Sequence, residues 1–91
     1  MTTRCGGRYI GRVLLYALST CLWCRRTREL LDGLRIPYEC IYVDLLSGYE
    51  RAELERELRQ LSPRLTFPMV VIGDKVITGY DLSAIRDALG G

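Results

Sequence analysis

The 91-residue chain contains no histidine. It therefore cannot build a Ser-His-Asp triad, a Cys-His pair or a histidine-ligated zinc site. Neither charge sign is in large excess, because 13 basic and 11 acidic side chains leave a net charge of only +2. We therefore expect neither nucleic acid nor an anionic membrane as a partner. Apolar stretches are also too short for a transmembrane helix, which needs roughly 20 residues.

The remaining composition is that of a folded globular domain. Hydrophobic residues make up 48% and charged residues 26% of the chain, far from the signature of disorder. At this length, one domain is the expectation. Residues 1–11 include three glycines and show no apolar period, so we predict a loose lead-in followed by a single domain over residues 12–91.

Cysteines are few, and their spacing is informative. Only Cys21 and Cys24 are close enough to form a local motif, whereas Cys5 and Cys40 stand alone. The segment before Cys21 weakly resembles a lipoprotein signal, but its apolar run is shorter than the roughly 7–15 residues of a signal core. The count fits no secreted disulfide scaffold, so a reducing, cytoplasmic compartment is the working expectation.

Hydrophobic periodicity predicts the element order β-α-β-α-β-β-α. A strand–helix unit at the front and a hairpin followed by a helix at the back predict an α/β fold with a four-stranded mixed sheet flanked by helices on both faces. Helix starts are predicted at Ser19 or Thr20, at Ser47, which forms a capping box with Glu50, and at Asp81. The predicted strands cover residues 13–17, 38–43, 69–72 and 75–78.

Cys21 and Cys24 stand where the first predicted strand passes into the first helix. Free backbone N–H groups and the helix dipole stabilise a thiolate at such a place, and Arg25, Arg26 and Arg28 add positive charge in the first turns of the helix. Cys21 is the better-placed nucleophile, and Cys24, one turn further along, is the resolving thiol.

A zinc site is the alternative interpretation of the cysteine pair. Tetrahedral zinc needs four ligands, and only Cys5 and Cys40 are left to complete the set. Cys40 falls in a predicted central strand, where cysteine behaves as a small buried hydrophobe, and Cys5 is expected to be an incidental thiol. The pattern therefore favours a redox pair and no metal.

Several short motifs follow one another along the chain. They are Leu15 to Cys24 with its centre Cys21-Leu22-Trp23-Cys24, then Thr66-Phe67-Pro68, Gly73-Asp74-Lys75 and Gly79-Tyr80-Asp81. In order and spacing, these motifs resemble those of the glutaredoxin family of the thioredoxin-fold superfamily. The resemblance covers about residues 12–90 and implies a thioredoxin-like (glutaredoxin) fold.

The resemblance also implies roles for individual residues. Cys21 would be the attacking thiolate, Cys24 the resolving thiol, and Pro68 a cis-proline facing the pair. The main chain of Phe67 would pair with the substrate. The other substrate-binding residues would be Trp23, Thr66, Gly79, Tyr80 and Asp81, of which Tyr80 and Asp81 match contacts to the γ-glutamyl part of glutathione. Such proteins hold no tightly bound cofactor, and glutathione is a candidate co-substrate.

Four departures from the family pattern bear on the substrate. Leu18 replaces a customary lysine, the centre is Cys-Leu-Trp-Cys instead of Cys-Pro-Tyr-Cys, and Met69 and Leu82 replace polar or acidic residues. Every change is toward apolar. This favours a protein or apolar disulfide over glutathione, as in the glutaredoxin-like redoxins that serve ribonucleotide reductase.

We therefore expect a monomeric thiol-disulfide oxidoreductase that reduces protein disulfides and takes electrons from a thiol or a flavoprotein reductant. Two alternatives stay open. One is a glutathione-dependent glutaredoxin. The other is a binding module in which Cys21, glutathione and a second subunit hold an iron–sulfur cluster.

Overall fold

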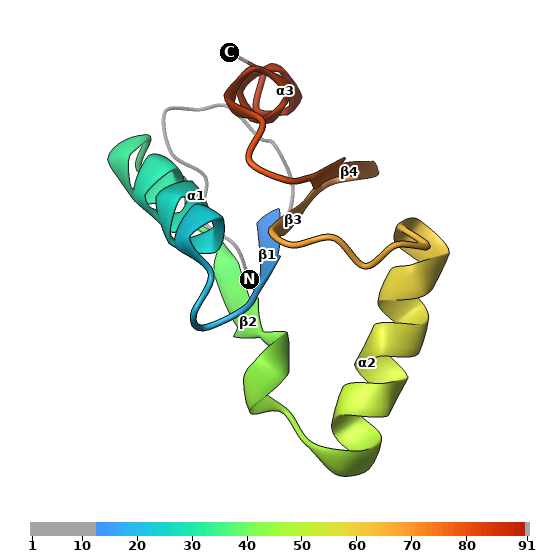
Figure 1. The fold of residues 1–91 in the computed structure, drawn as a ribbon. Coiled ribbons are helices and arrows are strands. Elements are labelled where there is room, and N and C mark those ends of the chain that lie inside the picture. Colours follow the sequence, from blue (N-terminus) through green and yellow to red (C-terminus); the bar gives the residue numbers. More distant parts are fainter. Residues whose placement is uncertain (1–12, 91) are drawn as a thin grey trace.

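The structure is a computed structural model in which residues 13–90 are described (Figure 1). It confirms the predicted order of strands and helices and adds one short 3₁₀ helix, η1. The predicted lead-in and Cys5 lie outside the described residues. In chain order the elements are β1 (Val13–Ala17), α1 (Leu22–Gly33), β2 (Glu39–Tyr42), η1 (Val43–Leu45), α2 (Gly48–Leu61), β3 (Met69–Ile72), β4 (Lys75–Thr78) and α3 (Leu82–Ala88).

The four strands form one mixed sheet in the order β2-β1-β3-β4. Strand β2 runs parallel to β1, whereas β3 runs antiparallel to both β1 and β4. The strand that carries Cys40 therefore lies at an edge, and the expectation of a central strand was wrong. The reason is topological: the crossover through α1 sets β2 on one side of β1, and the hairpin of β3 and β4 occupies the other side.

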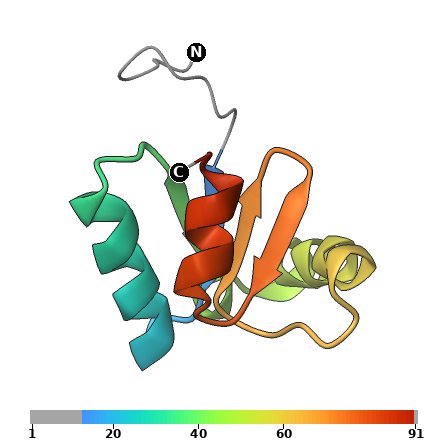
Figure 2. The ribbon, with the colours of Figure 1, turned by 90° about the horizontal axis from the view of Figure 1, so that it is seen from above.

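Helices α1 and α3 cover one face of the sheet, and α2 covers the other (Figures 1 and 2). Alternation along β1 explains the two faces, because successive side chains of a strand point in opposite directions. Leu15 joins the core beneath α1 and α3, whereas Tyr16 packs toward α2 with Met69 and Leu58.

Two of the predicted helix starts need correction. Helix α1 begins at Leu22 with Cys21 as its N-cap, because the hydroxyl of Ser19 hydrogen-bonds to Asp44 instead of to the helix. Ser47 is the N-cap of α2, but its side chain makes no capping hydrogen bond, so the predicted capping box does not form.

The third predicted helix start is confirmed. Asp81 caps α3, where its Oδ1 accepts a hydrogen bond of 3.0 Å from the amide of Ala84. This bond satisfies one of the free N–H groups at the start of the helix.

Several apolar residues that the helical period of the sequence places on the inner face of a helix are exposed. In α2 these are Ala52 and Leu61, and in α1 and α3 they include Trp23 and Leu82 in the first turn. The exposed fractions of Trp23, Leu61 and Leu82 are 53%, 48% and 39%. Leu31, Leu58 and Ile85 are the residues that the helices bury most completely. Among residues 13–90, no helix is long and apolar enough to cross a membrane.

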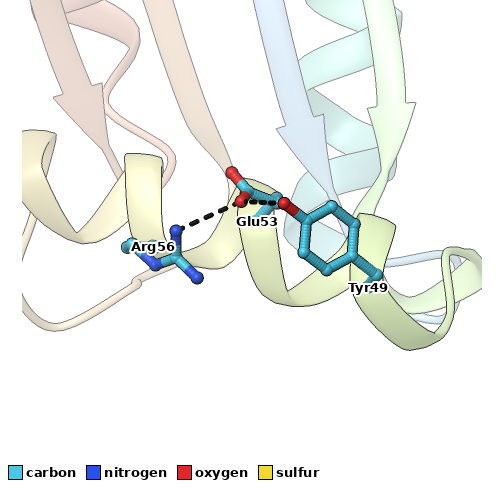
Figure 3. Close-up of polar contacts among 3 residues, drawn as sticks. All are labelled: Tyr49, Glu53 and Arg56. Carbon is cyan, nitrogen blue, oxygen red and sulfur yellow. Dashed lines mark hydrogen bonds and ion pairs between the residues drawn. The ribbon is translucent and has the colours of Figure 1, made fainter.

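The outer face of α2 carries charges of both signs, as its sequence predicts. The Glu53 carboxylate accepts a hydrogen bond of 2.7 Å from the Tyr49 hydroxyl and lies 3.2 Å from Nη1 of Arg56 (Figure 3). Arg51 and Glu55 form a further pair at 3.0 Å. Spacings of three and four residues place these side chains next to one another on the helix surface.

Candidate dithiol site

The two thiols of the predicted redox pair meet at the start of α1. The amide of Cys24 donates a hydrogen bond of 3.3 Å to Sγ of Cys21, so the first turn of the helix is closed on a sulfur atom. The amide of Leu18, at the end of β1, lies 3.5 Å from Sγ of Cys24. A helix N-terminus with an N–H group aimed at the sulfur is an arrangement that stabilises a thiolate.

The environments of the two thiols differ strongly. Cys24 is 1% exposed and belongs to the core beneath α1 and α3, whereas Cys21 is only half-buried. Burial, and next the hydrogen bond with Cys21, raise the pKa of the Cys24 thiol to about 12. Cys24 therefore stays protonated at neutral pH, and Cys21 is the thiol that an incoming disulfide can reach.

Arg25, the predicted partner of the thiolate, points into solvent. Its side chain is 73% exposed and lies 3.9 Å from Glu29. The Arg25 amide donates a backbone hydrogen bond of 3.1 Å to the Cys21 carbonyl, but within residues 13–90 no hydrogen bond or ion pair joins the Arg25 side chain to Cys21. Its effect on the thiolate stays a prediction.

Arg28, predicted from the sequence only as one of three positive charges near the thiolate, is the arginine of α1 that contacts the sheet. Its Nη1 donates a hydrogen bond to the Tyr42 hydroxyl, and its guanidinium carbon lies 5.8 Å from the centre of that ring. A hydrogen bond with Tyr38 is the main reason why the pKa of Arg28 is raised further. The side chain thus fastens α1 to β2 one turn after Cys24. Arg28 follows Cys24 by four residues, a spacing that places both side chains on the same face of α1 and could have indicated this contact from the sequence.

A groove of about 210 Å³ lies beside the dithiol and is lined by five predicted site residues, Trp23, Phe67, Pro68, Gly79 and Tyr80. The rings of Trp23 and Tyr80 stack across it, with centroids 5.4 Å apart and planes at 28°. The two remaining predicted residues, Thr66 and Asp81, are exposed and do not line this groove.

The backbone of the groove has the form that the resemblance implies. The Phe67–Pro68 peptide bond is cis. The amide of Gly79 donates a hydrogen bond of 2.8 Å to the carbonyl of Pro68, which ties the end of β4 to the proline. Gly79 has a φ of 79°, a left-handed conformation that favours glycine at this position.

Large apolar side chains are exposed at the starts of α1 and α3. Leu22 and Trp23, next to Cys21 in the chain, are each 53% exposed, whereas Tyr80, which stacks on Trp23, and Leu82, two residues further on, are 38% and 39% exposed. We call these four residues the apolar rim. Large exposed apolar side chains gathered at one place mark an interaction surface.

Cys40 is half-buried, not fully buried as expected. It lies opposite Leu15 in the register of β1 and β2 and packs at the margin of the core that contains Cys24. In the part of the chain that the structure describes, no group of three or more His, Cys, Asp or Glu side chains could hold a metal ion.

A dithiol at a helix N-terminus, a cis-proline groove beside it and a β2-β1-β3-β4 sheet define a thioredoxin-like dithiol protein. The family model for glutaredoxin matches residues 13–77. Human glutaredoxin-1 is 34% identical over 80 residues, which are 86% of this chain and 76% of that protein. A crystal structure of the glutaredoxin from Methanosarcina mazei has a TM-score of 0.83 at 40% identity and covers 89% of this chain and 80% of its own. The chain therefore belongs to the glutaredoxin family.

Two further solved structures bear on the choice of substrate. Buckwheat glutaredoxin, crystallised with glutathione, is 28% identical with a TM-score of 0.68, over 85% of this chain and 70% of its own. NrdH-redoxin from Escherichia coli, a glutaredoxin-like protein with a thioredoxin-like activity profile, is 25% identical with a TM-score of 0.71, over 85% and 93%.

Proposed function

We propose that this glutaredoxin reduces disulfides of protein substrates through Cys21 and Cys24 and receives its electrons from a reductant other than glutathione. The observation that carries the proposal is the asymmetry of the two thiols. Cys21 lies half-buried at a helix N-terminus beside a groove, and Cys24 is buried behind it with a raised pKa. Cys21 is thus placed to attack a disulfide, and Cys24 is placed to resolve the mixed disulfide that forms.

The reaction consists of two exchanges. The Cys21 thiolate attacks one sulfur of the substrate disulfide, so that a mixed disulfide forms and the first substrate thiolate leaves. Cys24 then gives its proton to the first substrate thiolate or to solvent and attacks the Cys21 sulfur, which breaks the mixed disulfide, releases the second substrate thiolate and leaves a Cys21–Cys24 disulfide. Two electrons pass to the substrate. A dithiol or flavoprotein reductant must return them, so the proposal includes a reducing, cytoplasmic setting.

The apolar rim supports a protein substrate. Four large exposed apolar side chains at the starts of α1 and α3 suit the surface of a folded or extended polypeptide better than a small charged tripeptide. The groove of about 210 Å³ is smaller than the roughly 300–1,000 Å³ of sites that enclose a small ligand. The thioredoxin-like activity profile of NrdH-redoxin shows that a related fold can carry such a function.

Glutathione is the second candidate electron donor. The observation in its favour is the groove itself, since Phe67, cis-Pro68 and Tyr80 meet beside Cys21 as the family pattern implies for glutathione binding. The complex of buckwheat glutaredoxin with glutathione is a precedent in the same family.

The fluorescence of Trp23 distinguishes the two donors. This residue is the sole tryptophan, lies between the two cysteines and stacks on Tyr80, so its emission should change when the disulfide opens. We expect slow reduction of the oxidised protein by glutathione and fast reduction by dithiothreitol or by a flavoprotein of the thioredoxin-reductase type. Fast reduction by glutathione, with a glutathionylated intermediate in the mass spectrum, would instead establish a glutathione-dependent enzyme.

Two substitutions test the assignment of the thiols. Cys21→Ser should abolish disulfide reduction because the attacking sulfur is gone. Cys24→Ser should accumulate a mixed disulfide between Cys21 and the substrate, visible by mass spectrometry, because the resolving thiol is gone. Full activity in Cys21→Ser would refute the proposed function.

A further inference from the structure

The loop before Cys21 is tied to a distant part of the chain by one carboxylate. The amide of Ser19 donates a hydrogen bond of 2.9 Å to Oδ1 of Asp44, and the Ser19 hydroxyl donates one of 2.6 Å to Oδ2. Asp44 lies in η1, which connects β2 to α2. Both carboxylate oxygens are therefore engaged by a single residue of the loop, an arrangement that fixes orientation as well as distance.

Hydrogen bonds of the Leu18 backbone link this contact to both cysteines. The N–H of Ser19 and the C=O of Leu18 belong to the same peptide group, and that carbonyl accepts a hydrogen bond of 3.2 Å from the amide of Cys21. The amide of Leu18, on the other side of the same residue, lies 3.5 Å from Sγ of Cys24. One end of a peptide group is thus held by Asp44, and the other end holds the residue that carries the nucleophile.

We propose that Asp44 is a positioning residue for the dithiol, acting through Ser19 to fix the Leu18–Ser19 peptide group and with it the main chain of Cys21. Thiol-disulfide exchange depends on the approach of one sulfur to another along a defined line, and a misplacement of about 1 Å can cost up to roughly a hundredfold in rate. The two hydrogen bonds from Ser19 also lower the pKa of Asp44, so the carboxylate is ionised at neutral pH.

The inference relies on the proposed function only for its biological meaning, because it concerns the geometry of Cys21 and not the identity of the substrate. It is tested on the reduced full chain with iodoacetamide, and the alkylation of each cysteine-containing peptide is followed by mass spectrometry. Cys40 serves as an internal reference, since it lies outside the network. Asp87→Ala is the matched control, because Asp87 is an exposed aspartate on α3 whose side chain has no hydrogen bond or ion pair among residues 13–90.

Asp44→Ala should slow the alkylation of Cys21 by about threefold to tenfold, with Cys40 unchanged. Asp44→Asn should retain most of the wild-type rate, because its amide oxygen accepts from the Ser19 amide and its amide nitrogen donates to the Ser19 hydroxyl. A purely electrostatic effect would give the opposite pattern: removal of a negative charge favours the Cys21 thiolate, so both variants would react faster and equally. That result, or an unchanged rate in Asp44→Ala, overturns the proposal.

A second pair of variants keeps the test decisive if Asp44→Ala fails to fold. Ser19→Ala removes the hydroxyl bond and leaves the amide bond, so Cys21 should react roughly twofold more slowly, and Ser19→Thr should restore the rate. Equal rates in all Ser19 variants would contradict the inference. If Asp44→Ala slows alkylation but the wild-type protein reduces no disulfide, the proposed function fails and the positioning role stands.

Discussion

The two faces of the sheet differ in how much they bury and in what they carry. The face beneath α1 and α3 has a core of ten buried residues, which includes Cys24 itself. The face beneath α2 has only three, Val43, Leu58 and Met69. The outer side of α2 is instead occupied by charged pairs such as Glu53 with Arg56 (Figure 3).

The difference shows where the precision of the dithiol comes from. A buried thiol in a close-packed core has little freedom to move, so Sγ of Cys24 is fixed by the same contacts that stabilise the fold. The α2 face contributes to the site mainly at one point, the connection through η1 that carries Asp44. We therefore expect substitutions on the α1 and α3 face to change stability and thiol chemistry together, and substitutions on the α2 face other than at Asp44 to change stability alone.

Truncation of one core leucine on each face gives the largest expected effect. Leu31 of α1 is 0% exposed and belongs to the larger core, and Leu58 of α2 is 1% exposed and belongs to the smaller core. Leucine-to-alanine changes in cores cost about 2–5 kcal/mol. The loss in the free energy of unfolding for Leu31→Ala should lie toward the upper end of this range, because the larger core around Leu31 collapses less. This substitution should also increase the reactivity of Cys24. Leu58→Ala should leave that reactivity unchanged.

Urea unfolding followed by Trp23 fluorescence measures the free energy of unfolding of both variants, and alkylation of Cys24 in native conditions measures its accessibility. The two leucines serve as controls for each other, since the chemical change is the same. If Leu58→Ala also exposed Cys24, the two faces would not be separable and the comparison would be wrong.

The sequence predicted the individual strands and helices better than their arrangement in the sheet. Strands β1, β3 and β4 and helix α2 were predicted with nearly their observed bounds, because a continuous apolar run or a helical period is a local property of the chain. The position of β2 at the edge was not predicted, since it depends on which strand takes the other side of β1. Trp23 was assigned inward by its period, but it lies in the first turn of α1 and is exposed.

Prediction of the site had similar limits. The spacing of Cys21 and Cys24 at a strand-to-helix junction was enough to predict a dithiol site at the start of α1, whereas the cis form of Pro68 was predicted only from the resemblance to a family. The contacts of Trp23 with Tyr80 and of Ser19 with Asp44 join residues far apart in the sequence, so no local sequence pattern predicts them.

The next prediction sharpens the link between the larger core and the resolving thiol. Because burial raises the pKa of Cys24 to about 12 from 9.0, the folded state holds this proton more tightly than the unfolded state does. Its contribution to stability is therefore fully present below pH 9.0 and is lost as the pH rises toward 12. The expected loss is on the order of a few kcal/mol.

Unfolding in urea under reducing conditions, at a series of pH values from neutral upward, measures this loss. Cys24→Ala is the control, since it lacks the titrating group but keeps every other one, including Tyr38, whose pKa burial also raises. The variant should lose less stability than the wild type over the alkaline range. Parallel curves would show that Cys24 is not held protonated by the core.

The smallest expected effect belongs to the α2 surface. The hydrogen bond from Tyr49 and then the charge of Arg56 lower the pKa of Glu53, so its contribution to stability is present above the ordinary pKa of 4.5 and is lost as the pH falls through the lowered value. Glu53→Gln should therefore lower the melting temperature at neutral pH by at most about 2 °C, because solvent screens exposed pairs. The difference should vanish in acid, and the alkylation rate of Cys21 should not change at any pH. Glu57→Gln, on the same helix, removes an exposed charge with no hydrogen bond or ion pair among residues 13–90 and should have no effect. A larger loss in Glu53→Gln, or a slower Cys21, would mean that the α2 face supports the dithiol more directly than its small core indicates.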